Sequence, residues 1–403
     1  MRFTAAAAVA ALAPAAPLAA ATPSTTAPAE GPASVVATAS APAPLRTSPR
    51  AVPGRYIVTL DKRLDAGTFA ERLKLKPTFL YTKALNGFAV PLTLSQLKSV
   101  RNALGVSAVE EDAEVSVAAP AGALGGRRAP AASWGLDRID QKALPLDDGF
   151  TVAADGTGVN AYVIDTGIDY THAEFGGRAA LGFDAIGDGR AGADCQGHGT
   201  HVAGTIGGKT FGVARNANLF SVRVLGCDGT GRWSGILAGM DWVAKNARQP
   251  AVVNASLGGP ESDAVDHAAA SMAAAGVLPV VAAGNSAVDA CDISPAGAEG
   301  VVTVGATNRR DEETSFSNWG ECLWLYAPGE AIVSAKLGGG SVAEDGTSMA
   351  SPHVAGVAAL YKQAHPEASA EEVAVWLEKQ STKDVLKNLS PASPDKLLFT
   401  GGS

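Results

Sequence analysis

Three residues whose types cooperate in nucleophilic catalysis stand at the ends of predicted secondary-structure elements. Asp165 is the first charge after an apolar run, His198 opens a glycine-rich helical segment, and Ser348 opens a helix of small residues. A serine hydroxyl is a weak nucleophile until a base takes its proton, and a histidine base needs a carboxylate that fixes its tautomer. The three residue types together favour a hydrolase that acts through a serine.

Each of these residues also has a structural interpretation. Asp165 could cap a turn, and Ser348 could be a helix N-cap. His198 and His201, three residues apart, could bind a metal, although neither an H-E-x-x-H pattern nor a cysteine cluster accompanies them. All three types occur at element ends, where α/β folds build their sites, and this coincidence favours catalysis.

From Trp134 onward, short and nearly continuous apolar runs alternate with helical segments. Such runs are typical of strands that are buried on both faces of a parallel sheet. The predicted strands cover residues 158–165, 217–225, 250–257, 276–284 and 300–306, and the helices between them cover 233–247 and 262–275. We expect an α/β domain over residues 134–403, with a mostly parallel sheet flanked by helices.

The part of the chain before Trp134 divides into four segments. Residues 53–117 follow the order strand, helix, strand, strand, helix, strand, which predicts a small ferredoxin-like α+β domain. Asn86-Gly87 indicates a hairpin turn between its middle strands. The remaining segments are a secretory signal peptide (1–21), an unstructured Pro/Ala-rich spacer (22–52) and a cleavable Gly/Pro/Ala linker (118–133).

Composition and charge argue against a nucleic-acid partner and against a membrane-spanning segment. The chain has 403 residues, of which 46% are hydrophobic and 18% charged, as in globular proteins. Residues 1–128 hold 14 Lys+Arg against 8 Asp+Glu, and residues 129–403 hold 18 against 32, a net of −14. An acidic main domain argues against a nucleic-acid partner, and no apolar run reaches the length of a membrane span.

Four cysteines are present, and none lies in C-x-x-C spacing. An even number of cysteines in a chain with a predicted secretory signal suggests two disulfides, and the sequence alone allows three pairings.

Longer sequence blocks resemble a known family. The chain order Asp165, His198, Ser348 is that of subtilisin. The blocks "VIDTGID", "GHGTHVAGT", "NASLGG", "VVAAGN" and "GTSMASPHVAG" resemble subtilisin-like serine proteases. The blocks "WGLDRID", "DCQGHGTH", "VLGCDGTG" and "SFSNWGECLWLYAPG" are similar to the proteinase K branch, closest to secreted aqualysin-like bacterial enzymes. Residues 53–117 resemble the inhibitory propeptide of that family.

The resemblance implies a secreted serine endopeptidase that is made as a self-processing zymogen. Ser348 is then the nucleophile, and His198 is the general base and later the general acid. Asp165 orients His198, and the Asn285 amide donates to the oxyanion together with the backbone N–H of Ser348. His201 and His353 are expected to be structural.

The resemblance also implies how protein and peptide substrates bind. They lie extended between residues 229–233 and 256–258, and main-chain hydrogen bonds make the selectivity broad. An uncharged pocket of small residues favours an apolar or aromatic residue before the scissile bond, and Trp233 lies at a more distant apolar pocket. The expected substrate-binding residues are Gly231, Trp233, Ser256, Leu257, Gly258, Ala283 and Gly284.

Disulfide pairing and metal binding follow from the same resemblance. The expected disulfides are Cys195–Cys227 and Cys291–Cys322. Structural Ca²⁺ is expected in one loop only, because Trp324 replaces an aspartate of a second site. The ligands in that loop are Asp137, Asp140, Gln141 and Asp147, and a solvated acidic turn is the alternative. We expect no catalytic cofactor, and a monomer that the propeptide inhibits and helps to fold.

Two other classes of function stay open at this stage. One is a non-catalytic binding protein on a protease fold; the loss of a triad residue would support it, and none is lost. A metal-dependent hydrolase using His198 and His201 would be inhibited by a chelator but not by a serine-directed phosphonylating reagent.

Overall fold

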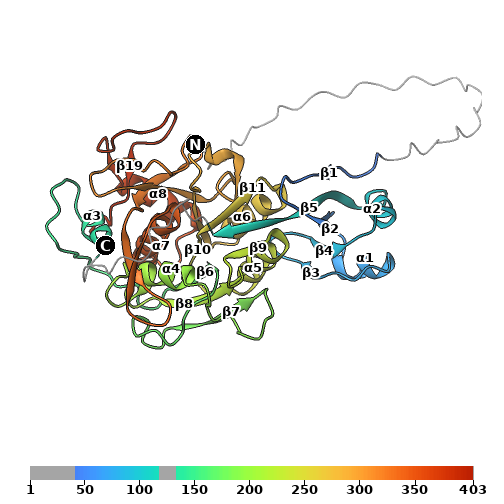
Figure 1. Cartoon of the computed structure of the whole chain (residues 1–403), viewed down its shortest axis with the longest axis horizontal. Helices are drawn as coiled ribbons and strands as arrows, with labels where there is room; N and C mark the ends of the chain where they lie inside the picture. Colours follow the sequence, from blue (N-terminus) through green and yellow to red (C-terminus); the bar gives the residue numbers. More distant parts are fainter. Residues whose placement is uncertain (1–40, 118–132, 403) are drawn as a thin grey trace, which may run out of the picture.

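The computed structural model describes residues 41–117 and 133–402, which form a small α+β domain and a large α/β domain (Figure 1). The signal peptide predicted at 1–21 lies outside the described residues, as do most of the predicted spacer and nearly all of the predicted linker. No helix among the described residues is long and apolar enough to cross a membrane.

The small domain has the predicted order of elements. Its sheet runs β5-β2-β4-β3 with antiparallel neighbours, and a hydrophobic cluster including Val58, Phe69, Phe88 and Val109 fills the space under the helices. A capping box between Thr93 and Gln96 begins the second helix. The elements are β2 (Ala51–Leu60), α1 (Ala66–Arg72), β3 (Phe79–Tyr81), β4 (Gly87–Pro91), α2 (Leu94–Arg101) and β5 (Val106–Val117).

The expectation of an unstructured spacer over 22–52 is wrong for residues 43–52. Strand β1 (Leu45–Arg46) pairs in parallel with β5, and the Ala43 N–H donates to the Arg101 carbonyl at 2.7 Å. We call residues 43–50 the N-terminal strap. Its composition is that of a linker, but the free edge of β5 supplies partners for its backbone, and sequence composition does not reveal those partners.

The large domain contains the predicted parallel sheet. Its strand order is β18-β19-β15-β14-β12-β10-β6-β8-β7, and every pair is parallel except β18 with β19. The five predicted strands are confirmed as β6 (Asn160–Asp165), β8 (Asn218–Arg223), β10 (Ala251–Ala255), β12 (Leu278–Ala282) and β14 (Val302–Thr307). The others are β7 (Ala179–Asp184), β15 (Leu325–Pro328), β18 (Thr382–Lys383) and β19 (Lys396–Leu397).

Helices cover both faces of this sheet, so successive residues of a strand enter different cores. Val163 packs in the cluster that includes helices α4, α7 and α8, whereas Ile164 packs in the cluster that includes α5 and α6. Two-sided burial explains why the strands read as continuous apolar runs. The helices are α3 (Trp134–Ile139), α4 (His198–Gly207), α5 (Trp233–Asn246), α6 (Asp263–Ala274), α7 (Thr347–Ala364) and α8 (Ala370–Gln380).

The end of β5 leaves the small domain and enters the large one. It lies between two short strands of the large domain, β9 (Thr230–Arg232) and β11 (Leu257–Pro260), and pairs antiparallel with both (Figure 1). The remaining short strands are β13 (Ile293–Ser294), β16 (Ile332–Ala335) and β17 (Ser341–Glu344).

Candidate active site

Asp165 and His198 meet at the carboxyl end of the parallel sheet. Asp165 ends β6 and is fully buried, and His198 is the first residue of α4. The His198 Nδ1 lies 2.8 Å from the Asp165 Oδ1, and the Thr166 N–H donates to the same oxygen at 2.7 Å. A carboxylate at Nδ1 holds the tautomer in which Nε2 accepts a proton. Asp165 therefore lies where it can orient His198, as the expected role requires.

The environment of His198 prepares it to act as a base. Burial lowers the pKa of His198, but the charge and hydrogen bond of Asp165 outweigh burial, so the pKa lies above its usual value. The Nε2 atom is buried and has no hydrogen-bond partner among the described residues. An imidazole with one nitrogen fixed and the other open can take and return a proton.

The loop before α4 fixes the backbone of His198. The Asp194 carboxylate accepts hydrogen bonds from the N–H groups of Gln196, Gly197 and Thr200, and the Gln196 side chain accepts from the His198 N–H at 2.7 Å. Gly197 has a φ of 116°, a left-handed conformation that favours glycine. Sequence reasoning missed Asp194, although an aspartate a few residues before a helix start is a recognisable capping signal.

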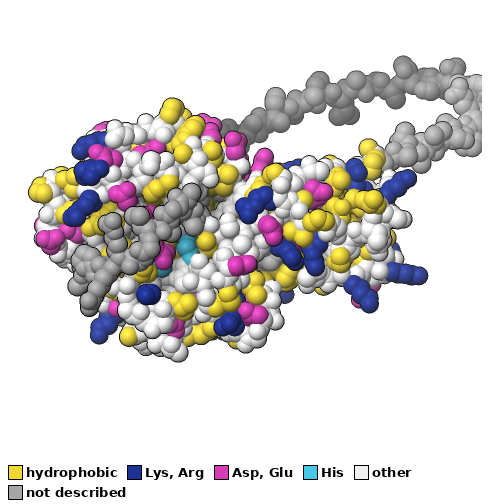
Figure 2. Space-filling view, viewed as in Figure 1, with side chains coloured by type: hydrophobic (Ala, Val, Ile, Leu, Met, Phe, Trp, Pro, Cys, Tyr) yellow, Lys and Arg dark blue, Asp and Glu magenta, His cyan; other side chains and the backbone are white. Residues whose placement is uncertain are grey.

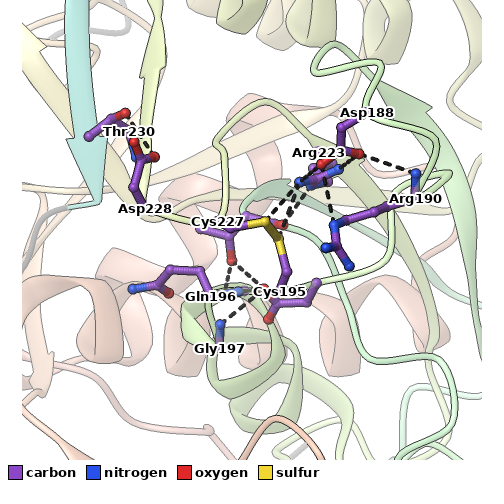
Figure 3. The surroundings of a disulfide bond; sticks show 12 residues. Asp188, Arg190, Cys195, Gln196, Gly197, Arg223, Cys227, Asp228 and Thr230 are labelled. Atoms are coloured by element: carbon purple, nitrogen blue, oxygen red, sulfur yellow. Dashed lines mark hydrogen bonds and ion pairs between the residues drawn. A yellow bond between two sulfur atoms is a disulfide. The ribbon is translucent and has the colours of Figure 1, made fainter.

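A disulfide holds this loop against the turn before β9. Cys195 is bonded to Cys227, and the buried Arg223 guanidinium donates to Cys195 Sγ at 3.3 Å and to Asp188 at 2.6 and 2.9 Å (Figure 3). The second disulfide joins Cys291 to Cys322. Both pairs are those that the family resemblance implies.

Ser348 is the second residue of α7 and is buried. Its Oγ donates to the Ser256 carbonyl at 3.2 Å, and the Ser256 Oγ donates to the Ser348 carbonyl at 2.9 Å. These bonds fix the start of α7 to the segment between β10 and β11. Helix α7 also packs against α4, which carries His198. The positive end of the helix dipole thus lies at Ser348, where it favours negative charge.

Asn285 follows β12 and is attached to the same helix start. Its Oδ1 accepts hydrogen bonds from the Thr347 N–H and the Thr347 Oγ1, both at 2.9 Å. Because Oδ1 acts as the acceptor, Nδ2 is the donor of this amide. The preceding Gly284 has a φ of 104°, and a Cβ there would lie 2.4 Å from Asn318 Nδ2, so no larger residue fits. Asn285 is thereby held beside the N-terminus of α7.

The predicted substrate edges already flank a strand of the small domain, and we call the space between β9 and β11 the cleft. Gly231 of β9 lies opposite Val115 of β5, while Leu257 and Gly258 of β11 lie opposite Val117 and Ser116. The remaining predicted substrate residues, Trp233, Ser256, Ala283 and Gly284, lie at the ends of adjacent elements. A Cβ on Gly259 would lie within 3 Å of both Val115 and Trp233, so Val115 packs beside the indole.

The small domain is docked to the large one by two carboxylates of β5. The Asp112 carboxylate accepts from the N–H and Oγ of Ser234, at 3.0 and 2.6 Å, in the first turn of α5. The Glu110 carboxylate accepts from the Ser262 Oγ at 2.8 Å and the Ala264 N–H at 3.1 Å, at the start of α6. Burial raises the pKa of both carboxyls. Sequence reasoning missed these two caps.

A loop of the small domain makes a third contact. The N–H groups of Thr82, Lys83 and Ala84 donate to one oxygen of Asp241 on α5, at 3.0, 2.6 and 2.8 Å. The hydroxyl of Tyr81 donates to the Ser234 carbonyl at 3.0 Å. The two domains therefore bury polar groups of each other at defined positions.

The other buried histidines have structural partners. His201 Nε2 lies 3.0 Å from the Ile332 carbonyl, and His353 Nδ1 lies 2.8 Å from the Met349 carbonyl. Burial lowers the pKa of His201 and lowers that of His353 to about 4, so both are neutral at pH 7. Among the described residues, the two groups of His, Cys, Asp or Glu close enough to hold a metal both contain disulfide sulfurs. The metal interpretation of His198 and His201 therefore gains no support.

The residues expected to hold calcium lie on α3, at its end and in the loop that follows it, and the chemistry of their oxygens fits the ion. The Asp137 carboxylate accepts from the N–H groups of Asp147 and Asp148, and Asp140 accepts from the Thr151 N–H. Burial, together with the charges of Asp137 and Asp147, raises the pKa of Asp140. A cation would relieve this repulsion, although the three carboxylates do not converge within 4.8 Å.

The predicted absence of calcium beside Trp324 is consistent with its contacts. The Trp324 indole N–H donates to the Ala374 carbonyl at 3.1 Å, and an indole offers no oxygen to a hard cation.

Comparison with known proteins identifies the family. Residues 156–397 match the model described as the subtilase family, and residues 74–118 match the peptidase inhibitor I9 family. The chain belongs to the subtilase family. It is 46% identical over 380 residues to an "Extracellular serine proteinase" of Thermus sp. (strain Rt41A). The aligned residues are 88% of this chain and 91% of that protein. The chain is accordingly a serine protease with an inhibitor domain.

Two further matches cover different shares of the chain. The "Alkaline serine exoprotease A" of Vibrio alginolyticus is 48% identical over 322 residues, which are 80% of this chain and 60% of that protein. The crystal structure of a cold-adapted subtilisin-like serine proteinase matches with a TM-score of 0.66 and 49% identity, over 67% of this chain and 99% of that one. The subtilisin-like fold expected from the sequence is confirmed.

Proposed function

We propose that the protein is a secreted endopeptidase made as a self-processing zymogen, in which β5 marks the path of the substrate. The observation that supports this most is the antiparallel pairing of β5 with both β9 and β11. The described strand ends at Val117, opposite Leu257, one residue from Ser256, whose carbonyl accepts from the Ser348 Oγ. A substrate chain that follows this path beyond the place of Val117 would approach Ser348.

The reaction follows from the roles of four side chains. Ser348 Oγ attacks the substrate carbonyl while His198 Nε2 takes the hydroxyl proton, and Asp165 stabilises the resulting imidazolium. Asn285 Nδ2 and the backbone N–H of Ser348 donate to the oxyanion. His198 then gives its proton to the leaving amine, and an acyl-enzyme forms. Water, activated by His198, hydrolyses the acyl-enzyme and releases the second product.

The cleft supports broad selectivity with an apolar preference. Strand β5 pairs with β9 and β11 along its backbone, and backbone pairing does not distinguish side chains. The residues expected to line the pocket before the scissile bond are small and uncharged, and Ala283 and Ala296 are buried in one cluster. An apolar or aromatic residue of the substrate would lose no hydrogen bond there.

The segments of the precursor have distinct roles in this proposal. A signal peptide (1–21) directs export, and the relative from Thermus carries the word extracellular in its name. The inhibitory propeptide domain extends from the N-terminal strap to residue 117, so its boundary lies before the expected residue 53. Residues 118–133 are the cleavable linker, and residues 134–403 are a peptidase domain that acts as a monomer without a nucleic-acid partner.

Charge and the position of β5 between β9 and β11 both favour inhibition by the small domain. Basic side chains project from its surface (Figure 2), and residues 53–117 hold 9 Lys+Arg against 7 Asp+Glu, opposite a domain with a net charge of −14. The docked domain also fills the cleft with β5, so it competes with substrate. The same contacts would help the slow, non-local parallel sheet to form.

Calcium has a structural role in the proposal and none in catalysis. The loop of Asp137, Asp140, Gln141 and Asp147 would hold the ion, which would neutralise adjacent carboxylates. Binding to the folded state alone raises stability.

A serine-directed phosphonylating reagent tests the proposed mechanism. Mass spectrometry of the processed wild-type protein should show one added phosphonyl group, mapped to the peptide that contains Ser348. The His198→Ala variant, whose propeptide is first removed by an added protease, should react with the reagent far more slowly. Labelling elsewhere, or activity lost to a chelator and not to the reagent, would contradict the mechanism.

A further inference from the structure

The two cleft strands carry a single charged side chain. Strand β9 reads Thr-Gly-Arg and β11 reads Leu-Gly-Gly-Pro, so Arg232 is that charge. Arg232 is exposed, and none of the ion pairs among the described residues includes it. Its guanidinium is thus available to a group in the cleft.

The register of β5 places an acidic residue directly opposite. Glu114 lies opposite Arg232, and Val115 lies opposite Gly231. The Val117 N–H donates to the Gly229 carbonyl at 2.9 Å, so this pair is hydrogen-bonded. Hydrogen-bonded and non-hydrogen-bonded pairs alternate, so Glu114 and Arg232 form a non-hydrogen-bonded pair, in which side chains approach most closely. The two charges lie on one face of the cleft.

A second acidic residue of β5, Asp112, lies close enough to Arg232 to feel its charge. Asp112 is two residues before Glu114, so both side chains leave β5 on the same side. Burial raises the pKa of Asp112, and the charges of Arg232 and Arg55 act in the opposite direction. Other charges flank the cleft strands at Asp228, which is bonded to Thr230, and at Glu261 after β11. Arg232 alone places positive charge within these strands.

We propose that Arg232 is a specificity-determining residue that favours an acidic side chain in the substrate at the place of Glu114. This place is three residues before that of Val117, on the side away from the scissile bond. The inference rests on the proposed function, in which β5 follows the path of the substrate. It adds an electrostatic selection to a cleft whose other contacts are backbone and apolar.

Matched peptides test the inference. Three peptides would differ only at the Glu114 place, with Glu, Gln or Lys, and kcat/KM would be measured for the processed wild-type enzyme, Arg232→Ala and Arg232→Glu. An exposed cross-strand pair predicts that the wild type prefers Glu to Lys by about threefold to fivefold. The ratio should approach one in Arg232→Ala and reverse in Arg232→Glu. Added salt should reduce the wild-type ratio.

The control variant is Arg309→Ala, which removes an exposed arginine far along the chain from the cleft strands. It should keep the wild-type ratio of Glu to Lys. The same ratio of Glu to Lys in the wild type and in both Arg232 variants would overturn the inference about Arg232. Hydrolysis of the Gln peptide in that experiment would still support the proposed function. No hydrolysis of any peptide by the wild type would instead contradict the proposed function itself.

Discussion

The interaction of Asp165 with His198 determines how activity depends on pH. His198 must be neutral to accept the serine proton, and its pKa lies above the usual value. Activity should therefore be lost as the pH falls through that raised pKa, with the acidic limb of kcat/KM above about pH 6.5. A pH profile of the processed enzyme measures this limb. An acidic limb well below pH 6 would contradict the role of Asp165.

Replacing the carboxylate tests the same pair directly. Asp165→Asn should lower kcat by about 10⁴-fold, because the amide no longer stabilises the imidazolium or the required tautomer. The acidic limb should also move to lower pH, a change that a merely misfolded enzyme would not show. Asp169→Asn, a change at a neighbouring aspartate, should leave both quantities near wild type. Equal losses in the two variants would count against the assignment.

The role proposed for Asn285 in the oxyanion hole predicts a different kind of loss. Asn285→Ala should lower kcat by about 10²–10³-fold with little change in KM, because the lost donor acts on the oxyanion and not on bound substrate; the magnitude is that of the corresponding donor in subtilisin, a relative. Steady-state kinetics separates the two parameters. A loss confined to KM would contradict a transition-state role.

At the scale of elements, the sequence predicts what is periodic and misses what depends on the other domain. The apolar runs around Val163 and Val253 specify buried strands, and Asp165 marks the end of one. The Asn86-Gly87 signal did not give a two-residue hairpin, because residues 82–86 form a longer loop between β3 and β4. That loop is held by Asp241, 157–159 residues away in sequence, so local turn preferences could not reveal it.

The N-terminal strap should strengthen the zymogen. Arg46 forms an ion pair with Asp263 at the start of α6, and the Ser48 N–H donates to Glu111 at 3.1 Å. Removing residues 41–50 from the Ser348→Ala chain should lower its thermal unfolding temperature and make the small domain more sensitive to added protease. Removing residues 22–31 provides a control of equal length. The same unfolding temperature in both deletions would contradict a role for the strap.

The caps on α5 and α6 predict that acid strengthens the docking of the propeptide. Because the pKa of Glu110 is raised in the docked state, its stabilising contribution is present below the usual carboxyl pKa and is lost as the pH rises through the raised pKa. In the Ser348→Ala chain, Glu110→Gln should therefore become relatively more stable than the parent as the pH rises across this range. Calorimetry between about pH 4 and pH 7 measures the difference. Glu71→Gln, on the exposed surface of α1, should show no such trend.

At the scale of the whole molecule, calcium should stabilise the protein through the loop of Asp137 to Asp147. The unfolding temperature of the Ser348→Ala chain should rise with calcium concentration, and Asp140→Ala should remove most of that rise. Trp324→Ala should be less stable at every concentration but keep the calcium-dependent increment. A calcium-dependent rise that survives in Asp140→Ala and disappears in Trp324→Ala would place the ion beside Trp324 and contradict the assignment to Asp137–Asp147.

Self-processing is the central proposal about the whole molecule, and the pairing of β5 with β9 and β11 supports it. The direct measurement is mass spectrometry of the purified full-length wild type and Ser348→Ala chains, incubated without any other protease. The wild type should release a fragment whose C-terminus lies within about two residues after Val117, because Val117 pairs with Leu257, the neighbour of Ser256, whose carbonyl accepts from the Ser348 Oγ. The Ser348→Ala chain should stay intact. The same cut in Ser348→Ala, or a wild type that is never cut near residue 117, would contradict the account.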